Sequence, residues 1–458
     1  MSKSDVEVRD PLHVFIRLLP KERAALNSRP MQRLRFIHQL SMSYLVYPGA
    51  THRRFEHSLG VMELVTQIFN VITDPRHLHH DEARDVMPAD TDALSYWRAV
   101  LRMAALFHDT GHLPFSHGAE KELLPEGWDH ERLSRELILS DEMSKVWASM
   151  EPPLTPEHIA LLAVGPAEGE TLPPWQALLN EILTGNVFGA DRIDYLLRDS
   201  HHAGVQYGRF DHFRLIDTMR ILPPPKVGGS DGGASRDPSL GIEDGGRESA
   251  EALLLARYAM FSQVYLHRTR RIYDLHLVDF AQQWLTETGH EDGRFPIDLD
   301  GHLSLTDNEL LAAIYAAAAG PEGRLRTLAR RITVRSERYV SVYEPSPGDL
   351  ATNVEAASQV TAALVERYGE DAVRHDSYAK VDDPFDFSLQ RRSGEVISSA
   401  SASELLGHIP AARTESVYCD RQYLSDAERW LASNKDQIIQ PTEHEEDDDD
   451  APDGKEGT

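Results

Sequence analysis

The chain has 458 residues, of which 41% are hydrophobic and 26% are charged, and its net charge at pH 7 is −27. This composition is typical of a globular protein that is large enough to bury a sizeable core. The acidic excess argues against sequence-independent nucleic-acid binding over the whole surface, and the sequence leaves a nucleic-acid partner open without indicating one. The single cysteine, Cys419, excludes an internal disulfide and indicates a cytoplasmic location. No run approaches the roughly 20 apolar residues of a membrane span, so no membrane partner is expected.

The beginning of the chain predicts an extended segment and two helices. Residues 5–26 form the extended lead-in, and residues 28–40 form the first helix, with Ser28 as its N-cap. A second helix is predicted from about Glu56 to Ile72. His57 lies on the apolar stripe of that helix, so its imidazole is expected to point into the protein.

The next predicted helix begins near Leu94 and ends in an unusual group of polar residues. His108 falls on the apolar stripe of this helix and is followed at once by Asp109. A buried carboxylate is costly unless a positive charge meets it. Imidazole and carboxylate together suit divalent metals, so this pair indicates a metal site. A core histidine that is bonded to its neighbour is the alternative for such a dipeptide taken alone.

The later helices add a third group of candidate residues. Further helix is predicted over residues 118–148, and Pro152 and Pro153 interrupt it. The stretch FGADRIDYLLRDSHH then places Asp191, Tyr195 and Asp199 at i, i+4 and i+8, on one face of a helix. Three carboxylate or phenol groups on one face are not what simple packing requires. Asp191 is therefore a further candidate metal ligand.

The remaining chain predicts more helix, two short strands and an acidic tail. Helical pattern runs over residues 249–280, and Thr306 with Glu309 indicates a capping box. Strands are predicted at 339–343 and 395–399. The expected domains are a core of residues 1–290 with a flexible, glycine- and proline-rich insertion at about 223–247, a mainly helical region of residues 291–440 with short strands, and a disordered acidic tail of residues 441–458.

Collected together, the candidate ligands are two imidazoles and two carboxylates from three helices. They are His57, His108, Asp109 and Asp191. Four protein ligands in a six-coordinate site leave room for a phosphate oxygen and a water, whose pKa a metal would lower. Mn, Mg, Fe, Zn and Ni remain open as the metal. The additional histidines, His112, His117 and His130, suit proton transfer near neutral pH, and Glu120 could orient one of them.

Five motifs together carry a resemblance to a known family. In chain order they are MQRLRFIHQL, YPGATHRRFEHSLGV, LFHDTGHLPFSH, WDHE and DRIDYLLRDSHHAG. The order His, His-Asp, Asp is similar to that of the HD-domain phosphohydrolases. The flanking residues resemble the deoxynucleoside triphosphate triphosphohydrolase branch of that family, from about Asp10 to Phe280. The fold that the resemblance implies is all-α, with an HD-domain helical core and a smaller C-terminal α+β region.

The resemblance also implies a role for each matching position. Those that match the metal ligands are His57, His108, Asp109 and Asp191. Those that match catalytic residues beside the α-phosphate are His112, His117, His130 and Glu120, of which His117 would protonate the leaving 5′ oxygen. Those that match contacts to the nucleotide are Gln39, Leu40, Arg54, Arg192, Tyr195 and Asp199. Arg192 replaces the family's usual lysine and keeps its charge but not its shape.

The implied activity is metal-dependent hydrolysis of a deoxynucleoside triphosphate to a nucleoside and inorganic triphosphate. The implied assembly is a homo-oligomer of two or four copies. One alternative is an HD phosphohydrolase that acts on another phosphoester, such as a nucleotide monophosphate or a nucleic-acid end. Another is a nucleotide-sensing protein with an idle site. The complete DRIDYLLRD helix favours the triphosphate substrate.

Overall fold

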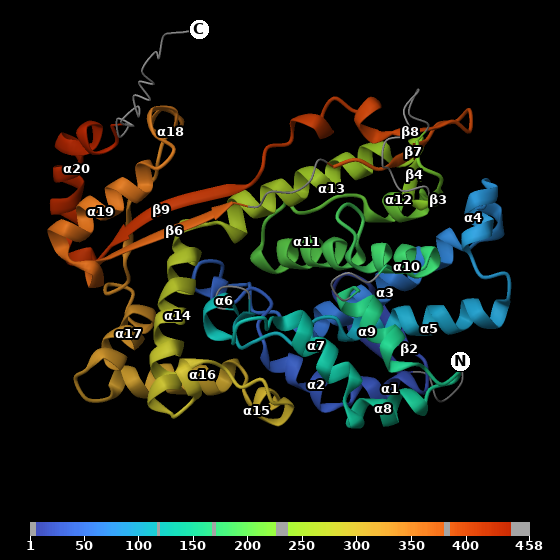
Figure 1. Cartoon of the computed structure of the whole chain (residues 1–458), viewed down its shortest axis with the longest axis horizontal. Coiled ribbons are helices and arrows are strands. Elements are labelled where there is room, and N and C mark those ends of the chain that lie inside the picture. The colour runs from blue at the N-terminus through green and yellow to red at the C-terminus, as the bar shows by residue number, and fades with distance from the viewer. Residues whose placement is uncertain (1–5, 117–119, 167–170, 226–236, 380–384, 441–458) are drawn as a thin grey trace, which may run out of the picture. The chain divides into compact units, whose positions relative to one another are not determined.

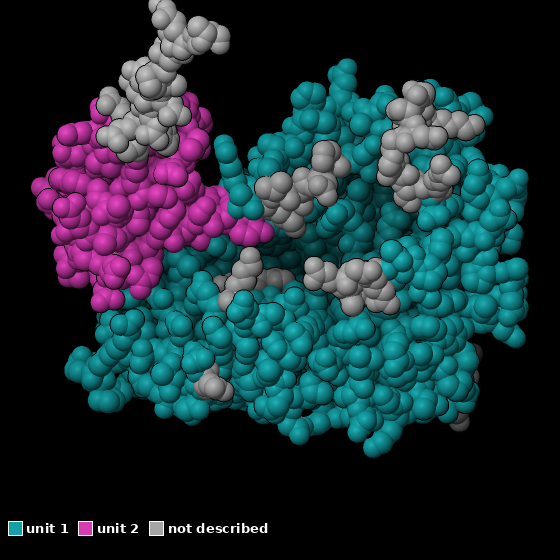
Figure 2. Space-filling model, viewed as in Figure 1, with its two compact units in different colours: residues 1–338, 379–413 teal, residues 339–378, 414–458 magenta. Residues whose placement is uncertain are grey.

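The structure of the protein is a computed structural model that describes residues 6–116, 120–166, 171–225, 237–379 and 385–440 (Figure 1). The chain divides into two compact units, which Figure 2 distinguishes by colour. Unit 1 comprises residues 1–338 and 379–413, and unit 2 comprises residues 339–378 and 414–458. The predicted boundary near residue 290 falls inside unit 1, and the functional division that it marks stays a prediction. The predicted acidic tail lies outside the described residues.

Unit 1 is mainly helical, in agreement with the predicted HD-type helical core. Its helices are α1 (Glu22–Leu26), α2 (Arg29–Arg33), α3 (Arg54–Ile72), α4 (Asp81–Val86), α5 (Thr91–Phe107), α6 (Glu120–Leu123), α7 (His130–Leu139), α8 (Asp141–Ala148), α9 (Pro156–Val164), α10 (Pro174–Thr184), α11 (Ala190–Ala203), α12 (His212–Asp217), α13 (Arg247–Met260), α14 (Arg268–Glu287), α15 (Leu299–Ser304), α16 (Asp307–Ala319) and α17 (Arg324–Thr333). Among the described residues, none of the helices has the length and apolar character that crossing a membrane requires.

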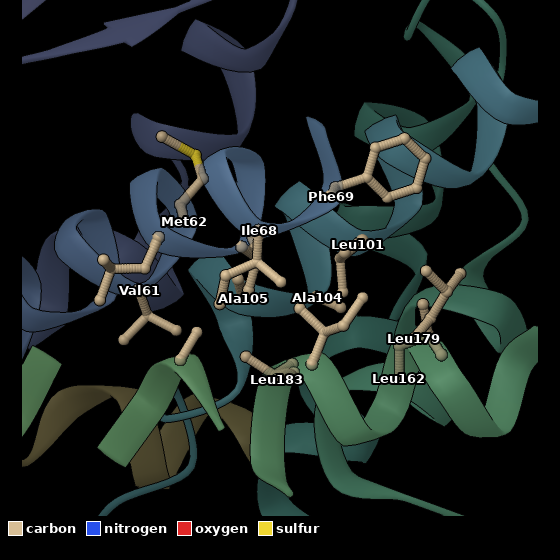
Figure 3. Close-up of a cluster of buried hydrophobic side chains, with 14 of the residues drawn as sticks. Val61, Met62, Ile68, Phe69, Leu101, Ala104, Ala105, Leu162, Leu179 and Leu183 are labelled. Atoms are coloured by element: carbon tan, nitrogen blue, oxygen red, sulfur yellow. The ribbon is translucent and has the colours of Figure 1, made fainter. Parts of the chain in front are cut away.

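The apolar stripes of α3 and α5 form the centre of the core of unit 1. Figure 3 shows that side chains of these two helices meet there and that α9 and α10 cover them. The labelled residues are Val61, Met62, Ile68 and Phe69 of α3, Leu101, Ala104 and Ala105 of α5, Leu162 of α9, and Leu179 and Leu183 of α10. Each is at most 3% exposed. This packing fixes α3 against α5, and the two helices carry the first candidate metal ligands.

Unit 1 also contains two small sheets, which an all-α class leaves out. Strands β1 (Val6–Asp10) and β2 (Val14–Leu18) form an antiparallel hairpin. The second sheet has the order β3-β4-β7-β8, with β3 (Met219–Leu222), β4 (Ser239–Glu243), β7 (Ser388–Gln390) and β8 (Val396–Ser398).

Strand β4 lies within the insertion that the sequence predicts to be flexible. It pairs with β3 in antiparallel and with β7 in parallel orientation. Gly241 permits the second pairing, because a Cβ at that position would lie 2.3 Å from the Ser388 carbonyl oxygen. The insertion therefore includes an ordered strand, and its residues 226–236 lie outside the described part of the chain.

Three predicted helices are interrupted. The described part of the stretch expected over residues 118–148 is divided into α6, α7 and α8. The helix expected over residues 28–40 ends as a 3₁₀ turn at Phe36, because the backbone of Ile37 is extended and His38 pairs with Arg53 as an isolated β-bridge. The helix expected over residues 249–280 is split into α13 and α14 by a π-helical segment, Phe261–Tyr265. Such π-helical segments are frequent at functional sites.

Unit 2 is a small α+β region. The predicted C-terminal region of residues 291–440 overlaps it only in part, since residues 291–338 and 379–413 belong to unit 1. Its helices are α18 (Pro347–Thr352), α19 (Ala356–Tyr368) and α20 (Leu424–Ile438), and its sheet has the order β5-β9-β6, with β5 (Val340–Tyr343), β6 (Val373–Ala379) and β9 (Arg413–Cys419). The two predicted strands are confirmed as β5 and β8. Buried residues from α19, α20 and the sheet, including Leu364, Leu431 and Val417, form a core of its own.

Glu181 near the end of α10 gives unit 1 a pH-dependent stability that we expect to be measurable. It accepts a hydrogen bond from the Leu240 backbone N–H at 2.9 Å, and burial raises its pKa from the ordinary 4.5 to about 7. Between these two values the folded protein binds more protons than the unfolded chain, so stability falls as pH rises. Glu181→Gln keeps the acceptor but removes the charge. We expect this variant to gain on the order of 1–2 kcal/mol over the wild type at pH 8 and much less at pH 5.

Urea unfolding at both pH values checks this expectation. A matched control is Glu142→Gln, since the Glu142 side chain is 37% exposed. An equal gain for Glu181→Gln at pH 5 and pH 8 would contradict the role of its charge.

Candidate active site

The candidate ligands gather where α3 begins, α5 ends and α11 begins. His57 lies in the first turn of α3, His108 is the C-cap of α5, and Asp191 lies in the first turn of α11. Helix α3 packs against both α5 and α11, so residues far apart in the sequence meet here. The two histidines are 1% and 7% exposed, whereas the Asp191 side chain is 34% exposed.

One donor atom each from His57, His108 and Asp191 lies within 4.8 Å of the other two. Asp191 Oδ1 is 3.0 Å from His57 Nε2 and 3.5 Å from His108 Nε2. Asp109 lies beside this group, with Oδ1 3.3 Å from His108 Nε2 and Oδ2 3.7 Å from His57 Nε2. The structure therefore brings all four predicted ligands together.

The orientation of both imidazoles fits a metal. His108 Nδ1 donates to the Ala105 carbonyl oxygen at 2.8 Å, and His108 Nε2 is buried and faces Asp109 Oδ1 at 3.3 Å and Asp191 Oδ1 at 3.5 Å. His57 Nδ1 lies 2.8 Å from Asp194 Oδ2 and donates to it. Each Nε2 is thus left for the cluster. Two imidazoles beside carboxylates are typical ligands of Fe, Zn, Ni or Mn, whereas Mg prefers oxygen ligands.

The carboxylates of the site also favour a bound cation. Burial opposes a charge on His57, but hydrogen bonds to Asp191 and Asp194 outweigh it and raise the pKa of His57 to about 10. Burial also disfavours the ionised form of Asp191, yet its hydrogen bonds to His108 and His57 hold the pKa well below the usual range. The same carboxylates that raise the pKa of His57 would stabilise a divalent ion bound between them and the imidazoles.

Asp194 supports the site and was not among the predicted site residues. Its carboxylate accepts from His57 Nδ1 and from Arg198, whose Nε and Nη2 lie at 2.8 and 2.9 Å, and Arg198 Nη1 reaches Asp10 at 2.8 Å. Asp194 and Arg198 are both 0% exposed. Gly60 makes room for this pair, because a Cβ there would lie 1.9 Å from Asp194 Oδ1. The i, i+4 spacing of Asp194 and Arg198 was the available sequence signal.

Arg54 connects the four candidate metal ligands to the loop that follows α5. Its Nη1 donates to Asp109 Oδ2, and its Nε donates to Ser116 Oγ at 2.7 Å. The side chain is 1% exposed, and Nη2 has no hydrogen-bond partner among the described residues. A buried guanidinium that has an unused N–H donor and lies beside candidate metal ligands is suited to bind a phosphate oxygen.

The predicted catalytic histidines form a stacked pair. The rings of His112 and His130 lie 4.0 Å apart and nearly parallel. His112 Nε2 is 3.2 Å from Asp109 Oδ1, and His130 Nδ1 is 2.8 Å from Glu120 Oε1. Burial and the nearby Arg54 charge lower the pKa of His112, while the Glu120 hydrogen bond outweighs burial and raises the pKa of His130. His117 lies outside the described residues.

The predicted nucleotide contacts form a second group on α11. Asp199 is 2% exposed, and its two oxygens accept hydrogen bonds from His52 Nε2 and from the Tyr265 hydroxyl, each at 2.7 Å. The Tyr195 ring lies 6.2 Å from the ring of Tyr265. Gln39 joins this group through its backbone N–H, which donates to the His52 carbonyl oxygen at 3.1 Å.

The other two predicted contacts are less closely connected to Asp199. Arg192 Nη1 donates to the Gly185 carbonyl oxygen at 2.7 Å. Leu40 is 7% exposed. His52 and Tyr265 were not predicted. His52 lies in the quoted YPGATHRRF loop, but Tyr265 ends the π-helical segment and has no periodic signal that would reveal its position.

Comparison with known proteins identifies two regions of the chain. Residues 54–151 match the family model of the HD domain, and residues 210–373 match that of the HD associated region. Three of the predicted ligands, His57, His108 and Asp109, lie in the first region. Asp191 lies between the two.

Several relatives match over much of this chain. It is 33% identical over 265 residues to the uncharacterized protein YwfO of Bacillus subtilis, which covers 57% of this chain and 52% of that protein. It is 29% identical over 341 residues to the deoxynucleoside triphosphate triphosphohydrolase SAMHD1 of Homo sapiens, covering 68% of this chain and 50% of that protein. The chain thus spans about half the length of these relatives. A crystal structure of a hypothetical protein from Aquifex aeolicus superposes with a TM-score of 0.73 at 26% identity, covering 93% of this chain and 100% of the other.

Proposed function

Since this chain belongs to the HD-domain phosphohydrolase family, we propose that it hydrolyses deoxynucleoside triphosphates at the α-phosphate to a nucleoside and inorganic triphosphate. One observation carries this proposal. Asp109 Oδ1 lies 3.3 Å from His108 Nε2 and 3.2 Å from His112 Nε2, so the metal donors and the stacked histidines are direct neighbours. A phosphate held by the donors is therefore within reach of groups that exchange protons.

The donor group supports a divalent cofactor. His57, His108, Asp109 and Asp191 would hold Mn, Mg, Fe, Zn or Ni, which when bound lowers the pKa of a water and offsets phosphate charge. Asp194 keeps the His57 ring in the orientation that presents Nε2. The Arg198 guanidinium balances the charge of Asp194, so this third carboxylate lies beside His57 without needing a metal ion as its partner.

The remaining residues bind the substrate in this proposal. Arg54 donates its unused Nη2 to a phosphate oxygen, and Arg192 with Tyr195 contacts the outer phosphates. Asp199 accepts from the ribose 3′ hydroxyl, which a carboxylate oxygen can do in addition to its bonds to His52 and Tyr265. Gln39 and Leu40 border the sugar.

Proton transfer falls to the histidines. His130 is held by Glu120 and stacks on His112, so the pair can take up or release one proton beside the α-phosphate. His117, on resemblance alone, protonates the leaving 5′ oxygen. The proposed assembly is a homo-oligomer of two or four copies, and the proposed location is the cytoplasm.

Product analysis tests the proposal. The protein is incubated with Mn or Mg and with each deoxynucleoside or ribonucleoside triphosphate, and the products are separated by anion exchange. We expect nucleoside and intact triphosphate, and in ¹⁸O water we expect the label in triphosphate. A nucleoside diphosphate with orthophosphate, or a monophosphate with pyrophosphate, would contradict attack at the α-phosphorus with loss of nucleoside. Hydrolysis of a monoester alone would favour the other phosphoester class, and metal binding without any turnover would favour a sensor.

A further inference from the structure

The loop from Gly111 to Ser116 carries His112 and Ser116, the partner of Arg54. The end of this loop has an unusual backbone conformation. Phe115 and Ser116 have φ values of 58° and 48°, in the left-handed region that residues other than glycine rarely adopt. Two such residues in succession persist only where the surroundings hold them. Ser116 is 2% exposed and accepts from Arg54 Nε, so together with Asp109 it fixes the direction of the Arg54 side chain.

Asp307 is the group that holds this loop. Its Oδ1 accepts from the Phe115 backbone N–H at 2.7 Å, and its Oδ2 accepts from the His38 backbone N–H at 2.7 Å. The His38 ring Nδ1 also lies 2.5 Å from Oδ2, and this ring is stacked between Tyr44 and Phe115. Asp307 is 1% exposed, so all of these hydrogen bonds lie inside the protein.

Helix capping does not explain Asp307. Although it is the first residue of α16, the cap is made by its neighbours. Thr306 Oγ1 accepts from the Asn308 N–H, and Glu309 Oε2 accepts from the Thr306 N–H at 2.8 Å. The capping box is therefore complete without the Asp307 carboxylate. A carboxyl group buried at this position requires another reason, because burial of a polar group is costly unless it is hydrogen-bonded.

A second connection joins the same two segments. Arg33 is 4% exposed and donates from Nε to the Leu305 carbonyl oxygen at 2.9 Å and from Nη1 to the His112 carbonyl oxygen at 2.8 Å. The residues on either side of Thr306 thus hold the loop at both His112 and Phe115. One point of attachment would allow the loop to rotate, whereas two points define its position.

We propose that Asp307 is a positioning residue for the reaction, because it fixes the His112–Ser116 loop and through Ser116 the guanidinium of Arg54. This inference rests on the proposed function of the same site. Asp307 touches neither the metal donors nor, in this assignment, the substrate. Its loss displaces groups that must be placed to within about 1 Å, a displacement that typically costs on the order of 10²-fold in rate.

Two variants and a matched control test the inference in the full, metal-loaded protein. Asp307→Ala removes both acceptors, and Asp307→Asn keeps one acceptor but places an N–H₂ group among the His38 donors. We expect kcat to fall about 10²-fold for alanine and about tenfold for asparagine, with KM within about threefold and metal content unchanged. The control is Asp349→Ala, since Asp349 is also a buried first-turn aspartate that accepts from Ser346 and Lys435 in unit 2. We expect its kcat to stay within about twofold of the wild type.

Backbone amide exchange gives a readout that does not depend on turnover. In Asp307→Ala the Phe115 amide should exchange at least tenfold faster, while the amides of α3 keep their wild-type rates. Unchanged exchange at Phe115, a kcat loss no larger than that of Asp349→Ala, or a loss that follows metal content would each overturn the inference. If the wild type hydrolyses no triphosphate but the Phe115 amide is released in the variant, the proposed function fails and the positioning of the loop by Asp307 stands.

Discussion

Asp191→Asn will remove bound metal and turnover together while the fold remains. The substitution keeps the shape of the side chain, but the donor group loses the carboxylate that lies 3.0 and 3.5 Å from the two imidazole nitrogens. Several kcal/mol of transition-state stabilisation depend on a metal in such a site, which corresponds to a fall in kcat on the order of 10³-fold. Metal content by elemental analysis and hydrolysis of each triphosphate, measured on the same preparation, check this result.

The control for this experiment is Glu181→Gln, which also turns a partly buried acid of unit 1 into an amide but lies outside the donor group. It should keep both metal and turnover. Circular dichroism should give the same helix content for both variants and the wild type. If Asp191→Asn kept its metal and its full rate, the ligand assignment would be wrong.

The largest expected effect on stability belongs to Arg198→Met. Arg198 is 0% exposed and forms three hydrogen bonds with Asp194 and Asp10, and a methionine of similar volume leaves both carboxylates without their cation. Loss of one partner from a buried ion pair typically costs about 3–5 kcal/mol. Because Asp194 also orients His57, metal affinity should fall by roughly 10- to 100-fold. Urea unfolding of the metal-free proteins gives the first quantity, and competition with a chelator gives the second.

The control for Arg198→Met is Arg84→Met, which removes an arginine from an ion pair at the surface. Its partner is Asp81, and the two side chains are 52% and 89% exposed. Exposed pairs contribute at most about 1 kcal/mol, so the urea midpoint should hardly move. Equal destabilisation by the two substitutions would contradict a special role of the buried network.

The proximity of the four candidate ligands was predictable because each of them belongs to a local pattern. His57 follows the apolar period of α3, His108 ends that of α5, and Asp191 begins a helix whose face is too polar for simple packing. Periodicity indicates which way a side chain points from its own helix. Inward-facing polar residues on three helices are best explained by a ligand that they share. The mainly helical fold followed from the same signal.

The supporting groups could not be predicted, since each depends on a contact between distant segments. Asp307 is far along the chain from Phe115 and His38, and nothing in its local sequence separates it from a helix-capping acid. Tyr265 reaches Asp199 only because a π-helical segment interrupts the α-helical period. Strand β4 has a parallel partner in β7, and glycine-rich sequence near it suggests a loop until that partner is known.

The pairing of β4 with β7 has a consequence for how the protein is made on the ribosome. Strands β7 and β8 belong to unit 1, yet they are encoded after the first segment of unit 2, residues 339–378. While a nascent chain lacks residues 388–398, one edge of β4 has no partner in this sheet. Open strand edges invite pairing with other chains. A protein that ends near residue 338 lacks β7 and β8. We therefore expect it to aggregate more readily than the full-length chain, in which β7 closes this edge of β4.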